Sequence, residues 1–156
     1  MKAVALVFSI LIFSAQAATA AILSVGTELA NVRSGPGADY EVAWEAVRYY
    51  PLEILDREGN WLKVSDYVND EGWIYQSLLS GVPSVVVISE KANLRKGPGM
   101  GYGIAQVLDK EYCLKVLEVQ GLWIKVTDNE TVTGWIHNSV VWGFTESPAL
   151  EKQPAH

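Results

Sequence analysis

The chain has 156 residues, with 12 basic and 18 acidic side chains and a formal net charge of −6 at neutral pH. Binding to nucleic acids or to anionic lipid surfaces depends on clustered Lys and Arg, so this balance argues against both kinds of partner. Cys113 is the single cysteine, which excludes an internal disulfide. We expect Cys113 to be a buried or half-buried small apolar residue rather than a nucleophile, because a reactive thiol needs a nearby base.

The first 20 residues predict a secretory signal peptide. Lys2 gives a basic start, residues 3–13 are apolar except for Ser9, and small residues follow up to Ala20. The segment ends in an Ala-x-Ala cleavage pattern, and its apolar run is shorter than the roughly 20 residues that span a bilayer. We expect cleavage after Ala20, or after Ala17, and hence an exported protein, periplasmic or extracellular, without a membrane span.

A duplication organises the rest of the chain. Residues 30–37, with the sequence ANVRSGPG, recur as ANLRKGPG at 92–99, and later Tyr, Trp and Gly-Trp-Ile motifs recur at the same offset of 62 positions. Aligning residues 30–79 with 92–141 gives 20 identities in 50 positions without a gap. Such a repeat indicates two copies of one small domain. We expect the copies at 21–80 and 85–144, a linker at 81–84, and a disordered polar tail at 145–156.

Each copy reads as a series of short β-strands. In the first copy we expect strands at 52–55 and 61–64 with a turn at 56–60 between them, and equivalent elements 62 positions later. The period of two places Leu62 and Val64 on the buried face of the second strand. Short strands with frequent turn residues predict an all-β chain of two small closed barrels, because closure removes the unpaired strand edges.

A Gly-Pro-Gly turn lies in the most similar segment of each copy, at residues 35–37 and 97–99. Pro fixes φ, and the flanking glycines are expected to reach φ values that other residues avoid, so we expect a sharp and stiff turn. A phosphate-binding loop is the functional alternative, but the Lys-Ser/Thr pair and the following helix that it needs are not found in the sequence pattern.

The motifs Asn-Val-Arg-Ser-Gly-Pro-Gly, Tyr, Gly-x-Trp-x-Lys-Val and Gly-Trp-Ile, in this order, resemble the bacterial SH3-like domain over residues 22–79 and 85–142. The resemblance implies two tandem SH3-like barrels that follow a cleaved signal peptide. It also implies a non-enzymatic module that binds peptidoglycan or its fragments in the cell envelope. The alternative is a protein–protein adaptor that docks on an envelope enzyme or assembly. We expect a monomer without a cofactor.

Aromatic side chains beyond those needed for the cores are the main site signal. Trp61 and Trp123 point away from the buried face, so they are expected either to line a groove or to cover the adjacent loop. Arg33 and Arg95 are expected either to hold a ligand carboxylate or to form an internal salt bridge. The candidate ligand-binding residues are Arg33, Tyr40, Trp44, Trp61, Tyr67, Tyr75, Arg95, Tyr102 and Trp123.

The two copies differ at several aromatic positions. The copies also differ in charge, with 4 basic and 10 acidic residues over 21–83 and 6 of each over 84–144. The first copy is therefore expected to carry an aromatic, acidic surface that the second lacks. Such a surface suits glycan rings or amine-bearing peptides, although the tyrosines could instead pack within loops. Trp44, Tyr49, Tyr67 and Tyr75 correspond to Gln106, Glu111, Asn129 and His137.

Asp66, Asn69, Asp70 and Glu71 gather in one segment of the first copy. Their spacing does not match a calcium-binding loop, so we expect a solvated acidic loop and no metal site. Catalytic chemistry needs a nucleophile or acid with a base and an orienting partner, and no such set recurs in the two copies. The sequence therefore predicts no catalytic residue.

Overall fold

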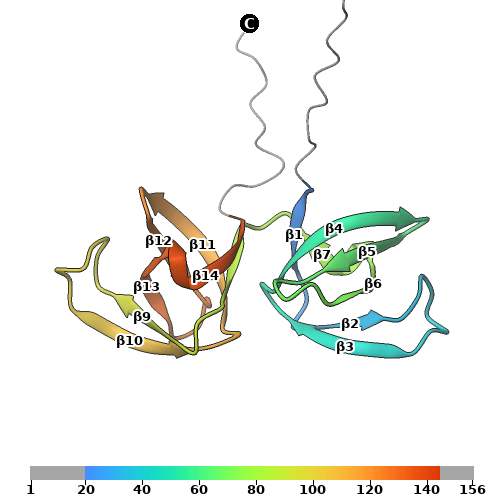
Figure 1. Ribbon diagram of the computed structural model, residues 1–156, viewed down its shortest axis with the longest axis horizontal. Coiled ribbons are helices and arrows are strands. Elements are labelled where there is room, and N and C mark those ends of the chain that lie inside the picture. The colour runs from blue at the N-terminus through green and yellow to red at the C-terminus, as the bar shows by residue number, and fades with distance from the viewer. Residues whose placement is uncertain (1–19, 145–156) are drawn as a thin grey trace, which may run out of the picture.

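The computed structural model describes residues 20–144, which form two seven-stranded antiparallel sheets, each curled around its own interior (Figure 1). The strand order is β3-β2-β6-β5-β4-β1-β7 in the first sheet and β10-β9-β13-β12-β11-β8-β14 in the second. Residues 1–19 of the predicted signal peptide and the predicted tail at 145–156 lie outside the described residues. Within residues 20–144 no helix is long and apolar enough to cross a membrane.

The strands of the second barrel begin 62 positions after their counterparts in the first, which confirms the duplicated all-β fold. Ser84, placed in the linker by the sequence analysis, is the first residue of β8. The first barrel contains β1 (Ile22–Val25), β2 (Leu29–Arg33), β3 (Val42–Val47), β4 (Pro51–Glu58), β5 (Trp61–Ser65), β6 (Glu71–Tyr75), the 3₁₀ turn η1 (Gln76–Leu78) and β7 (Leu79–Ser80). The second contains β8 (Ser84–Val87), β9 (Lys91–Arg95), β10 (Ile104–Asp109), β11 (Cys113–Gln120), β12 (Trp123–Thr127), β13 (Thr133–His137), the 3₁₀ turn η2 (Asn138–Val140) and β14 (Val141–Phe144).

The alternation in β5 is confirmed by the burial of its side chains. Leu62 and Val64 are 3% and 0% exposed and belong to the core of the first barrel. Burial of one such side chain contributes about 1.5–3 kcal/mol, and β12 repeats the pattern in the second barrel. Trp61 and Lys63, on the opposite face, are half-buried. The strand therefore anchors the core with one face and presents a large aromatic ring with the other.

The predicted turn at residues 56–60 is shorter than expected. Strand β4 continues to Glu58, and only Gly59 and Asn60 connect it to β5. A register shift between Ile54 and Asp56 marks a bulge that leaves Leu55 43% exposed. The bulge breaks the alternation of apolar and polar residues, which is why the sequence pattern predicts a strand that ends at residue 55.

The Gly-Pro-Gly turns are tight for a different reason from the one expected. Neither Gly35 nor Gly97 has a positive φ. Instead, the ring of Tyr40 lies against Gly35, where a Cβ atom would stand 2.3 Å from the ring. Tyr102 covers Gly97 at the same distance. These glycines are therefore required by the close approach of an aromatic ring rather than by an unusual backbone conformation.

The loop before β6 is held by a buried carboxylate. Asp66 is 7% exposed, and its carboxylate accepts hydrogen bonds from the Tyr50 hydroxyl at 3.2 Å and from the N–H groups of Val68 and Asp70 at 2.9 Å. The expectation of a solvated acidic loop was therefore wrong for Asp66. Among residues 20–144 no group of three or more His, Cys, Asp or Glu side chains is placed to hold a metal ion.

Asp128 has the same role in the second barrel. Its carboxylate accepts a hydrogen bond from the Tyr112 hydroxyl at 2.8 Å and from three N–H groups, those of Glu130, Thr131 and Val132, at 2.9 Å. Burial alone would raise the pKa of Asp128, but these hydrogen bonds outweigh it and lower the pKa to about 2. The ionised carboxylate therefore stabilises the folded loop.

Acidification should weaken the second barrel through Asp128. Because the folded-state pKa lies below the ordinary value of 3.8, the stabilisation is complete above about pH 5 and is lost as the pH falls through 4 to 2. We expect Asp128→Asn to remove about 1–2 kcal/mol at pH 6 and to change little at pH 2. Urea unfolding at both pH values measures this, with the exposed Asp109→Asn as control. An equal loss at both pH values would contradict the assignment.

The two barrels share apolar packing along a seam. Val86 in β8 is 0% exposed, yet it packs in the apolar cluster of the first barrel with Val25 and Cys113. Its neighbours Val85 and Val87 belong to the core of the second barrel. Strand β8 is therefore buried on both faces, and the barrels pack directly on one another.

The polar contacts across the seam are arranged crosswise. The Tyr67 hydroxyl donates to the Glu111 carboxylate at 3.1 Å, and the Asn129 amide donates to the Tyr49 hydroxyl. Positions 49 and 111 are counterparts in the two copies, as are positions 67 and 129. The residue at position 67 of the first barrel contacts position 111 of the second, and position 129 of the second contacts position 49 of the first. This is the pattern of an isologous interface with pseudo-twofold symmetry. In Figure 1 the β2–β3 and β9–β10 hairpins accordingly extend to opposite sides of the molecule.

Cys113 should report opening of the seam. It is 9% exposed, and burial together with the nearby Glu111 charge raises the pKa of its thiol to about 12. Because the thiolate is the reactive form, we expect alkylation at pH 8 to be at least about 100-fold slower in the folded protein than in urea. Mass spectrometry after timed exposure to iodoacetamide measures the ratio. Equal rates in the two states would show that the seam is open in solution.

Candidate functional site

A groove on the first barrel brings together three of the predicted site residues, Arg33, Trp61 and Tyr75. Trp61 begins β5 and Tyr75 ends β6, and the two residues are cross-strand partners. Their rings meet edge to face with centroids 5.4 Å apart. Arg33 ends the neighbouring strand β2. The groove has a volume of about 570 Å³ and is lined by Leu29, Ala30, Asn31, Arg33, Ala38, Glu45, Trp61, Tyr75 and Leu78.

The second barrel has a groove at the equivalent place. Trp123 and His137 are cross-strand partners in β12 and β13, and their rings meet edge to face at 5.1 Å. Arg95 at the end of β9 takes the place of Arg33. The volume is about 350 Å³, and the lining residues are Lys91, Ala92, Asn93, Arg95, Met100, Trp123, His137, Ser139 and Val140. The duplication has therefore preserved an Arg–Trp–ring arrangement in both barrels.

The two arginines are fixed by backbone oxygens rather than by carboxylates. Nη1 of Arg33 donates to the Tyr40 carbonyl at 2.9 Å, and Nη1 of Arg95 donates to the carbonyls of Tyr102 at 2.9 Å and Met100 at 3.3 Å. In the described residues neither arginine takes part in an ion pair, so the internal salt bridge considered from the sequence is not formed. A guanidinium has five N–H donors, and these contacts leave donors available to a ligand.

The other predicted site residues lie outside the grooves. Tyr40 and Tyr102 cover the Gly-Pro-Gly turns and are 49% and 52% exposed. Trp44 packs against the core of the first barrel, and its buried indole N–H has no hydrogen-bond acceptor within the described residues. Tyr67 lies in the seam, where burial and its hydrogen bond to Glu111 raise its pKa to about 12. The expected aromatic surface of the first copy is therefore divided among the core, the seam and the groove.

Two polar residues of the first groove were missed from the sequence. Asn31 in β2 and Glu45 in β3 are directly opposite one another in the register, and both line the first groove. Their strands alternate, with Ala30, Val32 and Ala46 buried between them. Outward-facing polar residues on adjacent strands were the available signal, but the pairing of β2 with β3 had to be known before they could be placed together.

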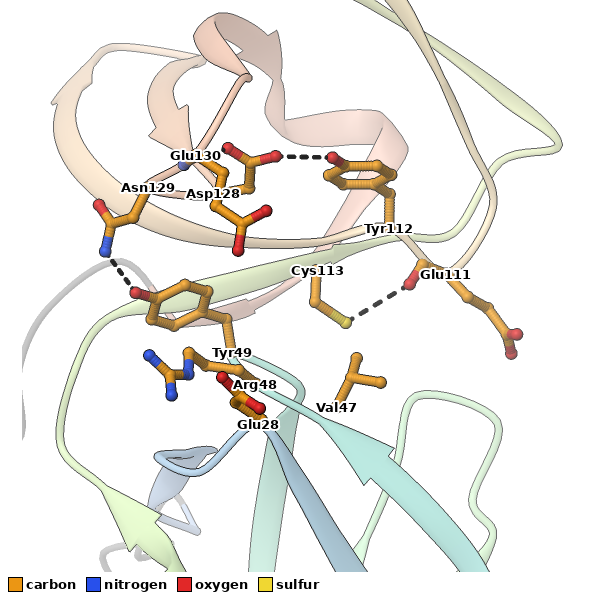
Figure 2. Close-up of a pocket in the computed structure, with 10 residues that line it drawn as sticks. All are labelled: Glu28, Val47, Arg48, Tyr49, Glu111, Tyr112, Cys113, Asp128, Asn129 and Glu130. Carbon is orange, nitrogen blue, oxygen red and sulfur yellow. Dashed lines mark hydrogen bonds between the residues drawn. The ribbon is translucent and has the colours of Figure 1, made fainter.

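A further cleft of about 700 Å³ lies between the barrels, and Figure 2 shows the side chains that line it. In this view the ring of Tyr49 in the first barrel points toward Asn129 in the second. Several of its polar groups already bond to one another, as in the Tyr112–Asp128 and Tyr49–Asn129 pairs. The cleft is therefore the open end of the seam, where part of the polar lining is already bonded within the protein.

The chemistry offered by the grooves is that of binding. Each presents a half-buried indole ring for stacking, an arginine for carboxylate or carbonyl groups, and an Asn side chain for hydrogen bonds. In the second groove Nδ1 of His137 lies 2.7 Å from the Ser139 hydroxyl and also accepts the Ser139 N–H. This contact caps the 3₁₀ turn η2.

Comparison with known proteins identifies the fold. Family models, each described as a bacterial SH3 domain, match residues 26–81 and 90–141, one within each barrel. Together they cover more than half of the chain, which belongs to the bacterial SH3 domain family. This confirms the resemblance that the repeated motifs indicated.

A curated relative is much longer than this chain. Over 151 residues the chain is 25% identical to the "Putative N-acetylmuramoyl-L-alanine amidase YrvJ" of Bacillus subtilis (strain 168). The match covers 90% of this chain but only 29% of that protein. Most of the relative's length, and whatever activity depends on it, therefore lies outside the similarity.

Two solved structures are similar to the chain at low identity. NlpC1 from Trichomonas vaginalis is 17% identical with a TM-score of 0.37, over 86% of this chain and 50% of that one. An NlpC/P60 family protein from Bacillus cereus ATCC 10987 is 13% identical with a TM-score of 0.38, over 78% and 56% of the two chains. At these scores the matches add nothing to the arrangement described above.

Proposed function

We propose that the chain is a non-enzymatic module that binds peptidoglycan, or a fragment of it, in the cell envelope. The observation that carries this proposal is the groove present in both barrels, where Arg33, Trp61 and Tyr75 have Arg95, Trp123 and His137 as counterparts. The arginine, the tryptophan and an asparagine, Asn31 or Asn93, are the same in both grooves.

The shape and chemistry of the grooves suit a glycan–peptide polymer. The half-buried faces of Trp61 and Trp123 offer flat apolar area to a sugar ring or a peptide plane. The guanidinium groups of Arg33 and Arg95 fit carboxylates and carbonyl oxygens. Peptidoglycan combines these features in one repeating unit, and the similarity to a protein named as an N-acetylmuramoyl-L-alanine amidase supports it as the ligand class.

The predicted signal peptide agrees with this location. Export would bring the module to the compartment in which peptidoglycan lies. The module would act as a monomer with two grooves, so that a polymer of repeating units can occupy both at once. An adaptor that docks on an envelope enzyme is the second candidate. It is favoured by the match to 29% of a protein named as an amidase, in which the similar region is part of a much longer chain.

Co-sedimentation with purified sacculi tests the proposal. The chain from Ala21 onward should pellet with sacculi at low salt and stay in the supernatant without them. Retention in the supernatant in both cases would exclude glycan binding. Recovery of one stoichiometric protein from an envelope extract, without sedimentation, would favour the adaptor instead.

Removing a groove ring without disturbing the core gives a sharper test. Tyr75 is 39% exposed, so Tyr75→Ala should fold and should weaken binding to sacculi by about three- to tenfold. Val68→Ala provides the matched control, because Val68 is 52% exposed and lies outside both grooves. Equal binding by the two variants would exclude the first groove as a site.

A further inference from the structure

The two grooves have the same framework but different charges. The first is lined by one cation and one anion, Arg33 and Glu45. Among residues 20–144, the second is lined by two cations, Lys91 and Arg95, and by no carboxylate. The difference arises at defined positions, because Leu29 of the first groove is replaced by Lys91 and Glu45 by Val107.

The register of the strands makes this substitution direct. Glu45 is paired with Asn31 across β3 and β2, and Val107 is paired with Asn93 across β10 and β9. Val107 therefore occupies the backbone position from which Glu45 reaches the first groove. Because valine carries no charge, the second groove lacks this carboxylate. The side chain of Val107 is 51% exposed, which leaves room for a carboxylate at this position.

The remaining polar groups of the second groove supply further donors. The Lys91 ammonium is exposed, and its ion pair with Asp109 lies at the surface, where such pairs are weak. Nδ1 of His137 accepts the Ser139 N–H, so the neutral ring carries its proton on Nε2, which is then a donor. Asn93 adds an amide. A groove with cations and N–H donors around an indole ring is complementary to an anion with an apolar neighbour.

We propose that the second groove binds the free carboxylate of a wall peptide, whereas the first groove binds a part of the ligand without net negative charge. This inference rests on the proposed function and adds a division of labour to it. The duplicated module then recognises two chemically different parts of the wall rather than the same part twice. Glu45 and its counterpart Val107 are the residues that determine the difference.

A pair of peptides that differ only in the carboxylate tests the proposal. N-acetyl-D-alanyl-D-alanine and its C-terminal amide are titrated into the ¹⁵N-labelled chain from Ala21 onward. The indole N–H signals of Trp61 and Trp123, assigned with Trp→Phe variants, report the two grooves separately. At Trp123 we expect the acid to bind at least about fivefold more tightly than the amide, and at Trp61 less than about twofold.

Exchange of the determining residues should exchange the preference. Val107→Glu is expected to weaken binding of the acid at Trp123 by about fivefold and to leave the amide unchanged, because it adds a like charge at an exposed position. Glu45→Val should raise the affinity of the acid at Trp61. Each variant serves as the control for the other, since both change an outward-facing residue at the same position of the fold.

Several outcomes would overturn the inference. Equal affinity of acid and amide at Trp123, no effect of Val107→Glu, or no Trp123 response to the acid up to about 50 mM would each do so. Inorganic phosphate that competes as well as the acid at matched ionic strength would show a general anion site instead. If sacculi still pellet the chain in any of these cases, the charge assignment alone has failed. If they do not, the proposed function has failed with it.

Discussion

Replacement of both Trp61 and Trp123 by Ala is expected to reduce binding to sacculi by at least about 100-fold. Each indole supplies the largest flat surface of its groove, and loss of such a ring costs about 1–2 kcal/mol, or about tenfold in affinity. Because the grooves belong to one chain, occupation of one raises the effective concentration of ligand at the other. The double variant should therefore lose more than either single variant.

The controls for this experiment are available in the same hairpins. Leu122 precedes Trp123, is 58% exposed and lies outside the groove, so Leu122→Ala should bind as the wild type does. Thermal unfolding of each variant shows whether the β5–β6 and β12–β13 pairs are intact. A folded double variant that still pellets with sacculi at wild-type level would exclude both grooves as the binding sites.

Val86→Asp is expected to separate the two barrels while leaving each folded. A carboxylate at this position would be buried in the cluster that contains Val25 and Cys113, and burying an unpaired charge costs several kcal/mol. Separation of the barrels exposes the new side chain to water and avoids that cost. Since Val86 is not part of the core of the second barrel, its replacement should destabilise the contact between the barrels and not the fold of the second barrel.

Three measurements follow the separation. The variant should show a larger radius of gyration by X-ray scattering, two thermal transitions in place of one, and alkylation of Cys113 at least about 100-fold faster than in the wild type. The neighbouring Val85→Asp is the contrast, because Val85 points into the second core and its replacement should unfold that barrel. An unchanged radius and a protected Cys113 in folded Val86→Asp would show that the seam is not formed in solution.

The fold was predictable because duplication makes the pattern visible twice. The offset of 62 positions located equivalent strands without a gap, and the period of two in β5 identified Leu62 and Val64 as core residues. The errors arose where local geometry departs from regular alternation. The bulge in β4 and the ring of Tyr40 on Gly35 are both set by contacts between segments, which a single strand pattern does not contain.

The site was only half predictable. Trp61, Tyr75 and Arg33 were candidates because they are large or charged and face outward, and the structure brings them together. Tyr49 and Tyr67 looked like further parts of a binding surface, yet they contact Asn129 and Glu111 across the seam. Differences between the copies at these positions reflect the pairing of two unlike halves. The three consecutive valines of β8 were a sequence signal for that seam, since a strand buried on both faces does not alternate.

The central claim is that ligand occupies the grooves of Arg33 and Arg95, and a crystal structure with a disaccharide–peptide fragment released from sacculi tests it most directly. The account predicts the fragment against Trp61 or Trp123, with an arginine N–H within about 3 Å of a ligand oxygen. A fragment bound only in the cleft between the barrels, or on a surface remote from both tryptophans, would contradict it.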